Sequence, residues 1–107
     1  MLILGITFKE NCPDIRNTKV IDIYNELNQY GLNVDIYDPW ADREEVIQEY
    51  NIKLLENSPL NNDYQAVIVA VAHEEFKEFK FSKYKENNTV IFDTKSFIDR
   101  SFIDGRL

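Results

Sequence analysis

Short apolar runs alternate with longer amphipathic stretches along this chain of 107 residues. The runs are rich in Val, Ile and Leu and do not alternate strictly with polar residues, which is typical of strands buried on both faces of a parallel sheet. They lie at 2–6, 34–37, 66–71 and 89–92, with a weaker run at 52–54. Helical patterns separate them, and this order predicts βαβ units with right-handed crossovers.

The stretches between the runs have the periodicity of helices. Between Thr18 and Tyr30, apolar side chains recur at positions i, i+3, i+4 and i+7, which gives a helix with one apolar face. Asn17 or Thr18 is expected to cap the start of this helix, and Gly31 is expected to end it. Further helices are expected over 44–50, 58–63 and 74–84.

These elements predict an α/β fold with a Rossmann-like, doubly wound parallel sheet of about five strands. Helices on both faces would make it a three-layer α/β/α sandwich. The expected strand order is 3-2-1-4-5, counting 52–54 as the third strand, with the first strand in the centre. The length suits one domain, residues 1–107, and no repeat or linker divides it. Because the first strand follows Met1 without a lead-in, we expect the domain to be a piece of a longer protein.

Composition argues against several classes of protein. The 12 Lys and Arg against 19 Asp and Glu give a net charge of −7, which is unfavourable for binding nucleic acid. No apolar run approaches the ~20 residues needed to span a bilayer, and no signal peptide with an apolar h-region is expected. The single Cys12 cannot form an internal disulfide and is compatible with a reducing cytoplasm. It is better explained as a structural residue than as a nucleophile, because the sequence places no base near it.

A loop that carries two cations follows the first strand. Lys9 and Arg16 lie where this strand reaches the carboxyl edge of the sheet and the next helix turns its N-terminus back toward that edge. Ligands of open α/β sheets bind at this edge, and helix N-termini favour anions there. The loop therefore indicates a ligand that contains phosphate. The alternative is that both cations are simply solvated loop charges.

Residues that follow the other strands should meet at the same edge. These include Asp38 after the second strand, the only histidine, His73, after the fourth, and Lys95 after the fifth. His73 is better explained as a capping or packing residue than as a metal ligand, because no metal-ligand cluster accompanies it. The loop also lacks the G-x-G-x-x-G fingerprint, and bulky Phe8 stands where the backbone would approach a pyrophosphate. We therefore expect no free-standing NAD-binding domain.

Several segments together resemble a known family. The spacing G-x-x-F-K…D-x-R-x-[ST] is the most specific of them, and the others follow in the same order at 34–40, 70–76 and 104–107. The chain resembles the C-terminal, UDP-binding domain of the UDP-glucose/GDP-mannose dehydrogenase family. The Ala-His pair at 72–73 and the Asp-x-Lys at 93–95 favour the bacterial UDP-N-acetylhexosamine 6-dehydrogenases of capsule, Vi-type and O-antigen synthesis.

The resemblance implies an activity and roles for individual residues. Members of the family oxidise the C6 alcohol of the sugar to a carboxylate, in two hydride transfers to NAD⁺ through a thiohemiacetal. Lys9, beside Phe8, would contact the UDP-sugar, and Arg16 would reach the pyrophosphate of NAD held mainly by the N-terminal domain. Lys95 stands where many relatives carry an arginine near the nucleotide sugar, so the planar guanidinium fork is lost here. The resemblance gives His73 no role.

The resemblance also implies that parts of the enzyme lie outside this chain. The N-terminal domain and the middle segment with the nucleophilic cysteine are absent, and Cys12 is not that nucleophile. The fragment alone is expected to be inactive. Its expected partners are a UDP-N-acetylhexosamine and the missing domains, and neither nucleic acid nor a membrane is expected. The parent protein is expected to be cytoplasmic and homo-oligomeric. The alternative is a stand-alone nucleotide-binding or regulatory module on the same fold.

Overall fold

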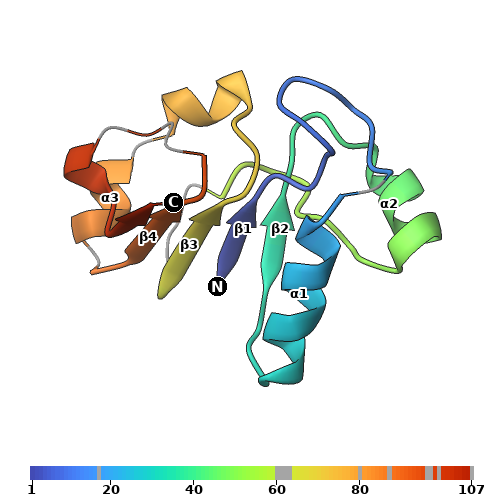
Figure 1. Cartoon of the computed structure of the whole chain (residues 1–107), viewed down its shortest axis with the longest axis horizontal. Coiled ribbons are helices and arrows are strands. Elements are labelled where there is room, and N and C mark those ends of the chain that lie inside the picture. The colour runs from blue at the N-terminus through green and yellow to red at the C-terminus, as the bar shows by residue number, and fades with distance from the viewer. Residues whose placement is uncertain are drawn as a thin grey trace.

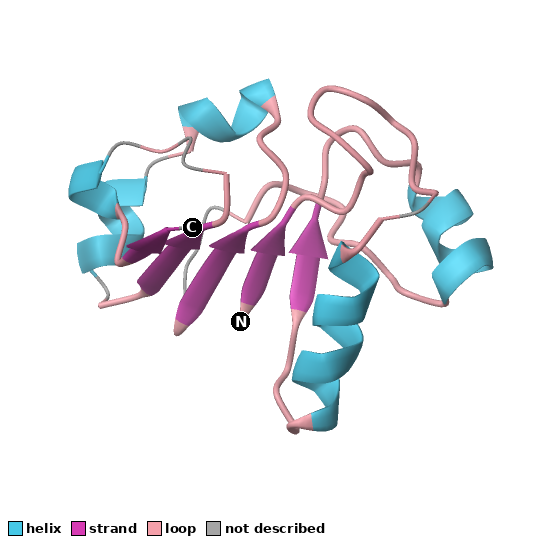
Figure 2. Ribbon diagram, in the orientation of Figure 1, coloured by secondary structure: helices cyan, strands magenta, loops and turns pink. Residues whose placement is uncertain are grey.

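The computed structural model describes residues 1–16, 18–59, 64–79, 81–86, 88–95, 98 and 100–106. Five parallel strands form one sheet in the order β2-β1-β3-β4-β5 (Figures 1 and 2). The strands are β1 (Leu2–Leu4), β2 (Asp35–Tyr37), β3 (Ala66–Val69), β4 (Val90–Asp93) and β5 (Gly105–Arg106). β1 is an inner strand, but it lies one position away from the centre predicted for it, which β3 occupies. The loop that follows β1 therefore starts between the ends of β2 and β3.

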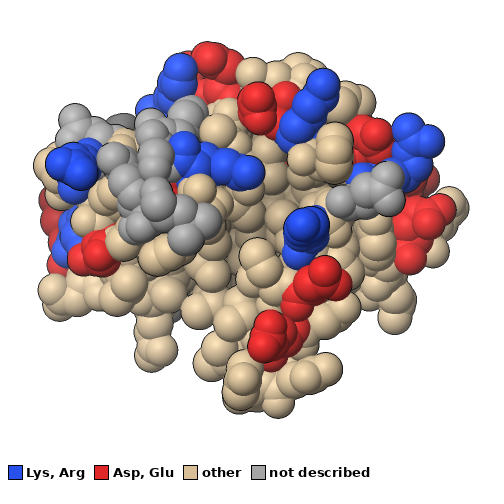
Figure 3. All heavy atoms as spheres, viewed as in Figure 1, with Lys and Arg blue, Asp and Glu red and all other residues tan. Residues whose placement is uncertain are grey.

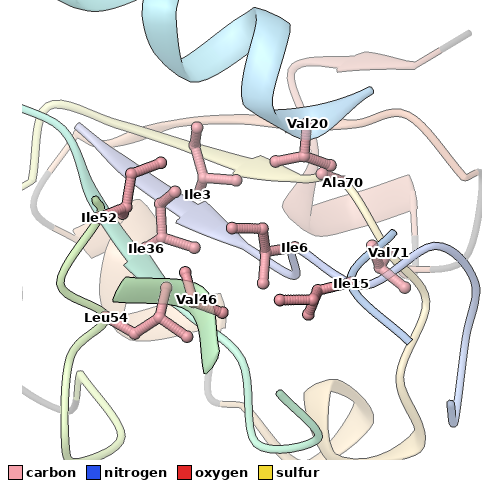
Figure 4. Close-up of a cluster of buried hydrophobic side chains, with 10 residues drawn as sticks. All are labelled: Ile3, Ile6, Ile15, Val20, Ile36, Val46, Ile52, Leu54, Ala70 and Val71. Atoms are coloured by element: carbon pink, nitrogen blue, oxygen red, sulfur yellow. The ribbon is translucent and has the colours of Figure 1, made fainter. Parts of the chain in front are cut away.

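One face of the sheet packs against α1 (Val20–Gln29) and α2 (Arg43–Tyr50). Ile3 of β1 and Ile36 of β2 point to this face and meet Val46 of α2 in a buried cluster, which Figure 4 shows in close-up. Val20, Tyr24 and Leu27 of the periodic pattern pack in the same cluster, so the apolar face of α1 is confirmed in part. Two other positions of the pattern, Ile23 and Tyr30, are exposed.

The opposite face packs against three short helices. They are the 3₁₀-helix η1 (Glu74–Glu78), α3 (Phe81–Glu86) and the 3₁₀-helix η2 (Arg100–Phe102). Leu4 and Val67, which alternate with the residues of the first face, lie in a second buried cluster with aromatic side chains from these helices. Helices therefore lie on both faces of the sheet, and the predicted three-layer α/β/α sandwich is confirmed. On the first face the cover does not extend over β4, where Val90 and Phe92 are exposed.

The prediction of a strand at 52–54 was wrong. Ile52 and Leu54 are buried beside β2, and the Leu55 N–H donates to the Ile36 carbonyl at 2.9 Å, but the segment does not pair as a strand. The fifth strand is instead β5, at the opposite edge beside β4. Its two residues are too few to show strand periodicity in the sequence. The predicted order holds for the other four strands.

The end of α1 follows its sequence signal, whereas the start does not follow it fully. The N-cap is Lys19, which makes no side-chain cap bond. The hydroxyl oxygen of Thr18, one residue earlier, accepts a hydrogen bond from the Val20 N–H at 3.2 Å, and Asn17, the other candidate cap, lies outside the described residues. Gly31 follows the helix with φ of +80°, and its N–H donates to the Asn28 carbonyl at 3.0 Å. This is the left-handed termination that glycine favours.

The single helix predicted over 74–84 was wrong, because two helices form there. Phe79 lies between η1 and α3 with φ of −67° and ψ of 136°, which is extended backbone. On one continuous helix, at roughly 100° per residue, the aromatic residues at 76, 79, 81 and 84 would spread over an arc of roughly 200°, too wide for one buried stripe. The break allows both helices to bury aromatic side chains in the second cluster.

The helices of the described residues are short. The longest of them, α1, has 10 residues, and none is long and apolar enough to cross a membrane. The helix expected over 58–63 falls mostly on residues 60–63, which lie outside the described part of the chain, and Ser58 and Pro59 are not helical.

Val67 and Val90 offer a matched test of the two-sided core. They lie on neighbouring paired strands, but Val67 is fully buried whereas Val90 is 52% exposed. We expect Val67→Ala to lower the free energy of unfolding by about 2 kcal/mol or more, because it leaves a cavity in the core. Val90→Ala should lower it by less than about 1 kcal/mol. Urea unfolding followed by the fluorescence of Trp40 measures both values, and equal losses would contradict the assigned packing.

Candidate functional site

The loop between β1 and α1 rises above the carboxyl ends of the strands (Figure 1). It begins at Gly5, whose φ is +101° and where a Cβ atom would lie only 2.6 Å from the Cβ of Val71. Glycine is required here because the chain leaves β1 in close contact with the end of β3. The loop closes on itself where the Phe8 N–H donates to the Asp14 carbonyl at 2.7 Å.

The carboxylate of Asp38, the residue that follows β2, lies beneath this loop. Its Oδ2 accepts hydrogen bonds from the N–H groups of Ile6 at 2.7 Å and Thr7 at 3.1 Å. Its Oδ1 accepts from the N–H groups of Trp40 at 2.8 Å and Ala41 at 3.2 Å. The side chain is fully buried. One carboxylate therefore holds the start of the β1 loop against the turn that follows β2.

His73 brings the segment after β3 to the same point. Its Nε2 lies 3.0 Å from Asp38 Oδ2 and 3.0 Å from Thr7 Oγ1, and its imidazole is fully buried. The segments that follow three adjacent strands thus meet in one buried polar group, which we call the strand-end cluster: Thr7, Asp38 and His73. Its members are 31 to 66 residues apart in the sequence.

The surroundings of Asp38 determine its charge. Burial raises the pKa of this carboxyl, but the hydrogen bonds from His73 and from the N–H groups of Ile6 and Trp40 outweigh that effect. The pKa therefore lies below the ordinary value for aspartate. The strand-end cluster contains a carboxylate ion at neutral pH, stabilised by the donors that surround it.

Three of the predicted site residues lie along this edge of the sheet. Phe8 is 57% exposed on the loop, and Lys9 beside it is exposed, with its carbonyl accepting from the Thr7 hydroxyl at 3.0 Å. Lys95 is exposed after β4, where its N–H donates to Asp93 Oδ1 at 2.9 Å. Since β1 and β4 are two sheet positions apart, their ends are roughly 10 Å from each other. Exposed Lys and Arg side chains alternate with acidic ones on this side (Figure 3).

Arg16, the fourth predicted site residue, lies on the α2 side of the loop. Its Nε and Nη2 donate to the two carboxylate oxygens of Asp14, at 3.0 and 3.2 Å. The hydrogen bond from Arg16 lowers the pKa of Asp14. The neighbouring Ile15 carbonyl accepts from the Tyr50 hydroxyl at 2.6 Å, which fixes this segment to α2. The structure therefore does not bring Arg16 together with Lys95, which lies on the β4 side.

The sequence placed Asp38 and His73 at this edge but did not reveal their contact. His73 was expected to cap or to pack, and it packs: its side chain makes no cap bond to η1. Their positions in the predicted topology could have revealed the pair. Asp38 directly follows β2 and His73 closely follows β3, and these two strands flank β1. Within the described ranges, no group of three or more His, Cys, Asp or Glu residues could hold a metal ion.

A Rossmann-like sheet with exposed cations on the loops at its carboxyl edge defines a class of nucleotide-binding domains. Comparison with known proteins identifies the family. The chain belongs to the UDP-glucose/GDP-mannose dehydrogenase family, whose UDP binding domain matches residues 2–100. The resemblance expected from the sequence motifs is confirmed.

The most informative relatives by sequence are bacterial. The chain is 43% identical over 110 residues to a UDP-N-acetyl-D-glucosamine 6-dehydrogenase of Pseudomonas aeruginosa, covering 100% of this chain and 26% of that protein. It is 40% identical over 99 residues to Protein CapL of Staphylococcus aureus, covering 91% of this chain and 23% of that protein. The chain therefore spans about a quarter of the length of these relatives.

Solved structures show the same fold. The chain superimposes on the UDP-N-acetyl-mannosamine dehydrogenase Cap5O from S. aureus with a TM-score of 0.73 and 29% identity, over 98% of this chain and 24% of that one. A UDP-glucose dehydrogenase from Pyrobaculum islandicum matches with a TM-score of 0.76 and 19% identity, over the same shares, and supports the fold alone.

The lowered pKa of Asp38 predicts how stability depends on pH. A folded-state pKa below the unfolded value stabilises the fold above the unfolded pKa, and this contribution is lost as the pH falls through the folded pKa. We expect the free energy of unfolding to decrease below about pH 4. Asp38→Asn should lower it by about 3 kcal/mol at neutral pH and reduce its dependence on acid.

Urea unfolding at a series of pH values measures this effect. Asp22→Asn removes the same charge from the exposed surface of α1 and serves as the control. If Asp38→Asn and Asp22→Asn lose the same stability, the strand-end cluster does not support the fold as described.

Proposed function

We propose that this chain is the UDP-sugar-binding domain of an NAD-dependent 6-dehydrogenase that oxidises a UDP-N-acetylhexosamine to the uronic acid, for surface polysaccharide synthesis. The observation that carries the proposal is the position of Lys9: it stands exposed on a loop that the buried strand-end cluster holds at the carboxyl edge. The part of the family that residues 2–100 match is its UDP binding domain, which supports the proposal. Relatives named for UDP-N-acetylhexosamines support the substrate class.

The exposed side chains of the edge suit parts of a UDP-sugar. The ammonium of Lys9 can stabilise a phosphate as a point charge, and Lys95 can supply a second positive charge from the β4 side. The ring of Phe8, exposed beside Lys9, offers an apolar surface to the nucleotide. Because the chain has a net charge of −7 and acidic side chains are interspersed at this edge, an anion bound here would depend on the local charge of these two lysines.

Arg16 would serve the cofactor rather than the sugar nucleotide. Its side chain is 81% exposed and points toward solvent from the α2 side of the loop, where another part of a longer protein could present a pyrophosphate. The carboxylate of Asp14 holds the guanidinium in a bidentate pair until then. In this proposal the loop works between two domains, with Lys9 serving the substrate and Arg16 serving NAD.

The chemistry itself would come from outside this chain. We propose that residues 1–107 are one domain of a longer, cytoplasmic and oligomeric dehydrogenase, since the chain spans about a quarter of its relatives. The nucleophilic cysteine and the main NAD site would belong to the remainder. The purified 107-residue chain, mixed with UDP-N-acetylhexosamine and NAD⁺, should therefore produce no NADH.

Calorimetric titration with UDP tests the binding proposal. We expect the wild-type chain to bind UDP, and Lys9→Ala to bind about tenfold more weakly or worse, because a charge-assisted hydrogen bond contributes about 1.5–3 kcal/mol. Lys83→Ala is the matched control: Lys83 is exposed on α3, which leads into the start of β4 and so lies toward the opposite edge. Equal affinities for the two variants would contradict the role of Lys9.

A further inference from the structure

We propose that His73 is the positioning residue of the Lys9 loop, acting as a neutral imidazole with its proton on Nε2. The consequence for nucleotide binding rests on the proposed function, whereas the state of the ring and its hold on the loop do not.

The partners of the ring determine where its proton lies. The backbone N–H of Asn11 points at His73 Nδ1, with the two nitrogen atoms 2.9 Å apart. An amide N–H can only donate, so Nδ1 must accept and cannot itself carry hydrogen. The proton of a neutral ring is therefore on Nε2, which lies 3.0 Å from the carboxylate Oδ2 of Asp38 and can donate to it. A doubly protonated ring would place two N–H groups against each other at Asn11.

The ring is attached to the loop on both sides of Lys9. On the C-terminal side, Asn11 donates to Nδ1, and its side-chain Oδ1 accepts from the Glu74 N–H at 2.9 Å. On the N-terminal side, Nε2 lies 3.0 Å from Thr7 Oγ1, whose hydroxyl donates to the Lys9 carbonyl at 3.0 Å. The five residues from Thr7 to Asn11, which include Phe8 and Lys9, are thus held at both ends by the imidazole of His73 and by the neighbouring Glu74.

Asn11, which donates to His73, has a strained backbone conformation. Asn11 has φ of 53°, in the left-handed region that few residues other than glycine and asparagine occupy readily. Its two hydrogen bonds, to His73 and from Glu74, compensate for this conformation. Without them, the loop would have no described contact that requires Asn11 to stay in this geometry.

Aromatic side chains enclose the imidazole on two sides. The Trp40 ring stacks on it with centroids 6.1 Å apart, and the Phe76 ring lies tilted at 5.4 Å. The Trp40 Nε1–H donates to Glu75 Oε1 at 2.9 Å, which fixes the indole in place. Because the imidazole is fully buried, its hydrogen bonds lie in an environment of low dielectric constant, where such bonds are stronger than in water.

A fixed loop has a direct consequence for binding. The backbone that carries Lys9 is ordered before a ligand arrives, so binding does not have to order it. Loss of the His73 contact should weaken the binding of a phosphate-containing ligand even though His73 itself is buried and touches none of it.

Two substitutions separate the roles of the two ring nitrogens. The amide oxygen of His73→Asn can take the place of Nδ1 and accept from Asn11, whereas the amide of His73→Gln reaches the place of Nε2 and leaves the Asn11 N–H without its acceptor. We expect the Asn11 amide to exchange its hydrogen about tenfold faster in His73→Gln than in His73→Asn, as the loss of one hydrogen bond implies. UDP affinity, measured by calorimetry, should follow the same order.

Nitrogen-15 NMR of the imidazole in the unsubstituted chain tests the proposal without any variant. At neutral pH we expect the signals of an unprotonated Nδ1 and a protonated Nε2. A protonated Nδ1, or equal exchange of Asn11 in the two variants, would overturn the positioning role. If the unsubstituted chain did not bind UDP, that result would instead count against the proposed function. The nitrogen-15 signals of His73 and the hydrogen exchange of Asn11 would still test the positioning role.

Discussion

The buried carboxylate of Asp38 is the interaction on which the arrangement of the binding edge depends. A buried charge is costly unless donors surround it, and here the donors come from the loop after β1, the turn after β2 and the imidazole after β3. The energetic need to satisfy one carboxylate therefore fixes three chain segments relative to one another. Gly5 makes this possible, because only a residue without a side chain can turn away from β1 so close to Val71.

Buried and exposed side chains have different roles at the carboxyl edge of the sheet. The strand-end cluster is buried and fixes the position of the loop, whereas Lys9, Lys95 and Arg16 are exposed, and we propose that they supply the charge for a nucleotide. The charge of Asp38 stays buried and stabilised by its hydrogen-bond donors beneath the loop, so the lysines at the edge remain the exposed groups that we propose for an anion. In the same proposal His73 contributes to the site through the position of the loop and not through a metal.

Sequence reasoning predicted the layers and most of the sheet, because burial on both faces leaves a local pattern of apolar residues. It failed where the local pattern is weak or misleading: 52–54 is apolar but lies beside β2 without pairing, and β5 has only two residues. One helix was predicted over 74–84, whereas two helices form there and both bury aromatic side chains in the second cluster. The edge residues were placed correctly by topology, but the contact between Asp38 and His73 joins positions 35 residues apart and leaves no pattern in either segment.

The most direct test of the account is a titration of the ¹⁵N-labelled chain with UDP, followed through its backbone amide signals. We expect the signals of Phe8, Lys9 and Lys95 to shift progressively with UDP, together with that of Asn11 in the same loop as Phe8 and Lys9. Signals at the opposite edge, such as those of Val34 and Thr89 ahead of β2 and β4, should stay in place. Shifts confined to the opposite edge, or a loop whose signals do not respond while UDP binds elsewhere, would contradict it.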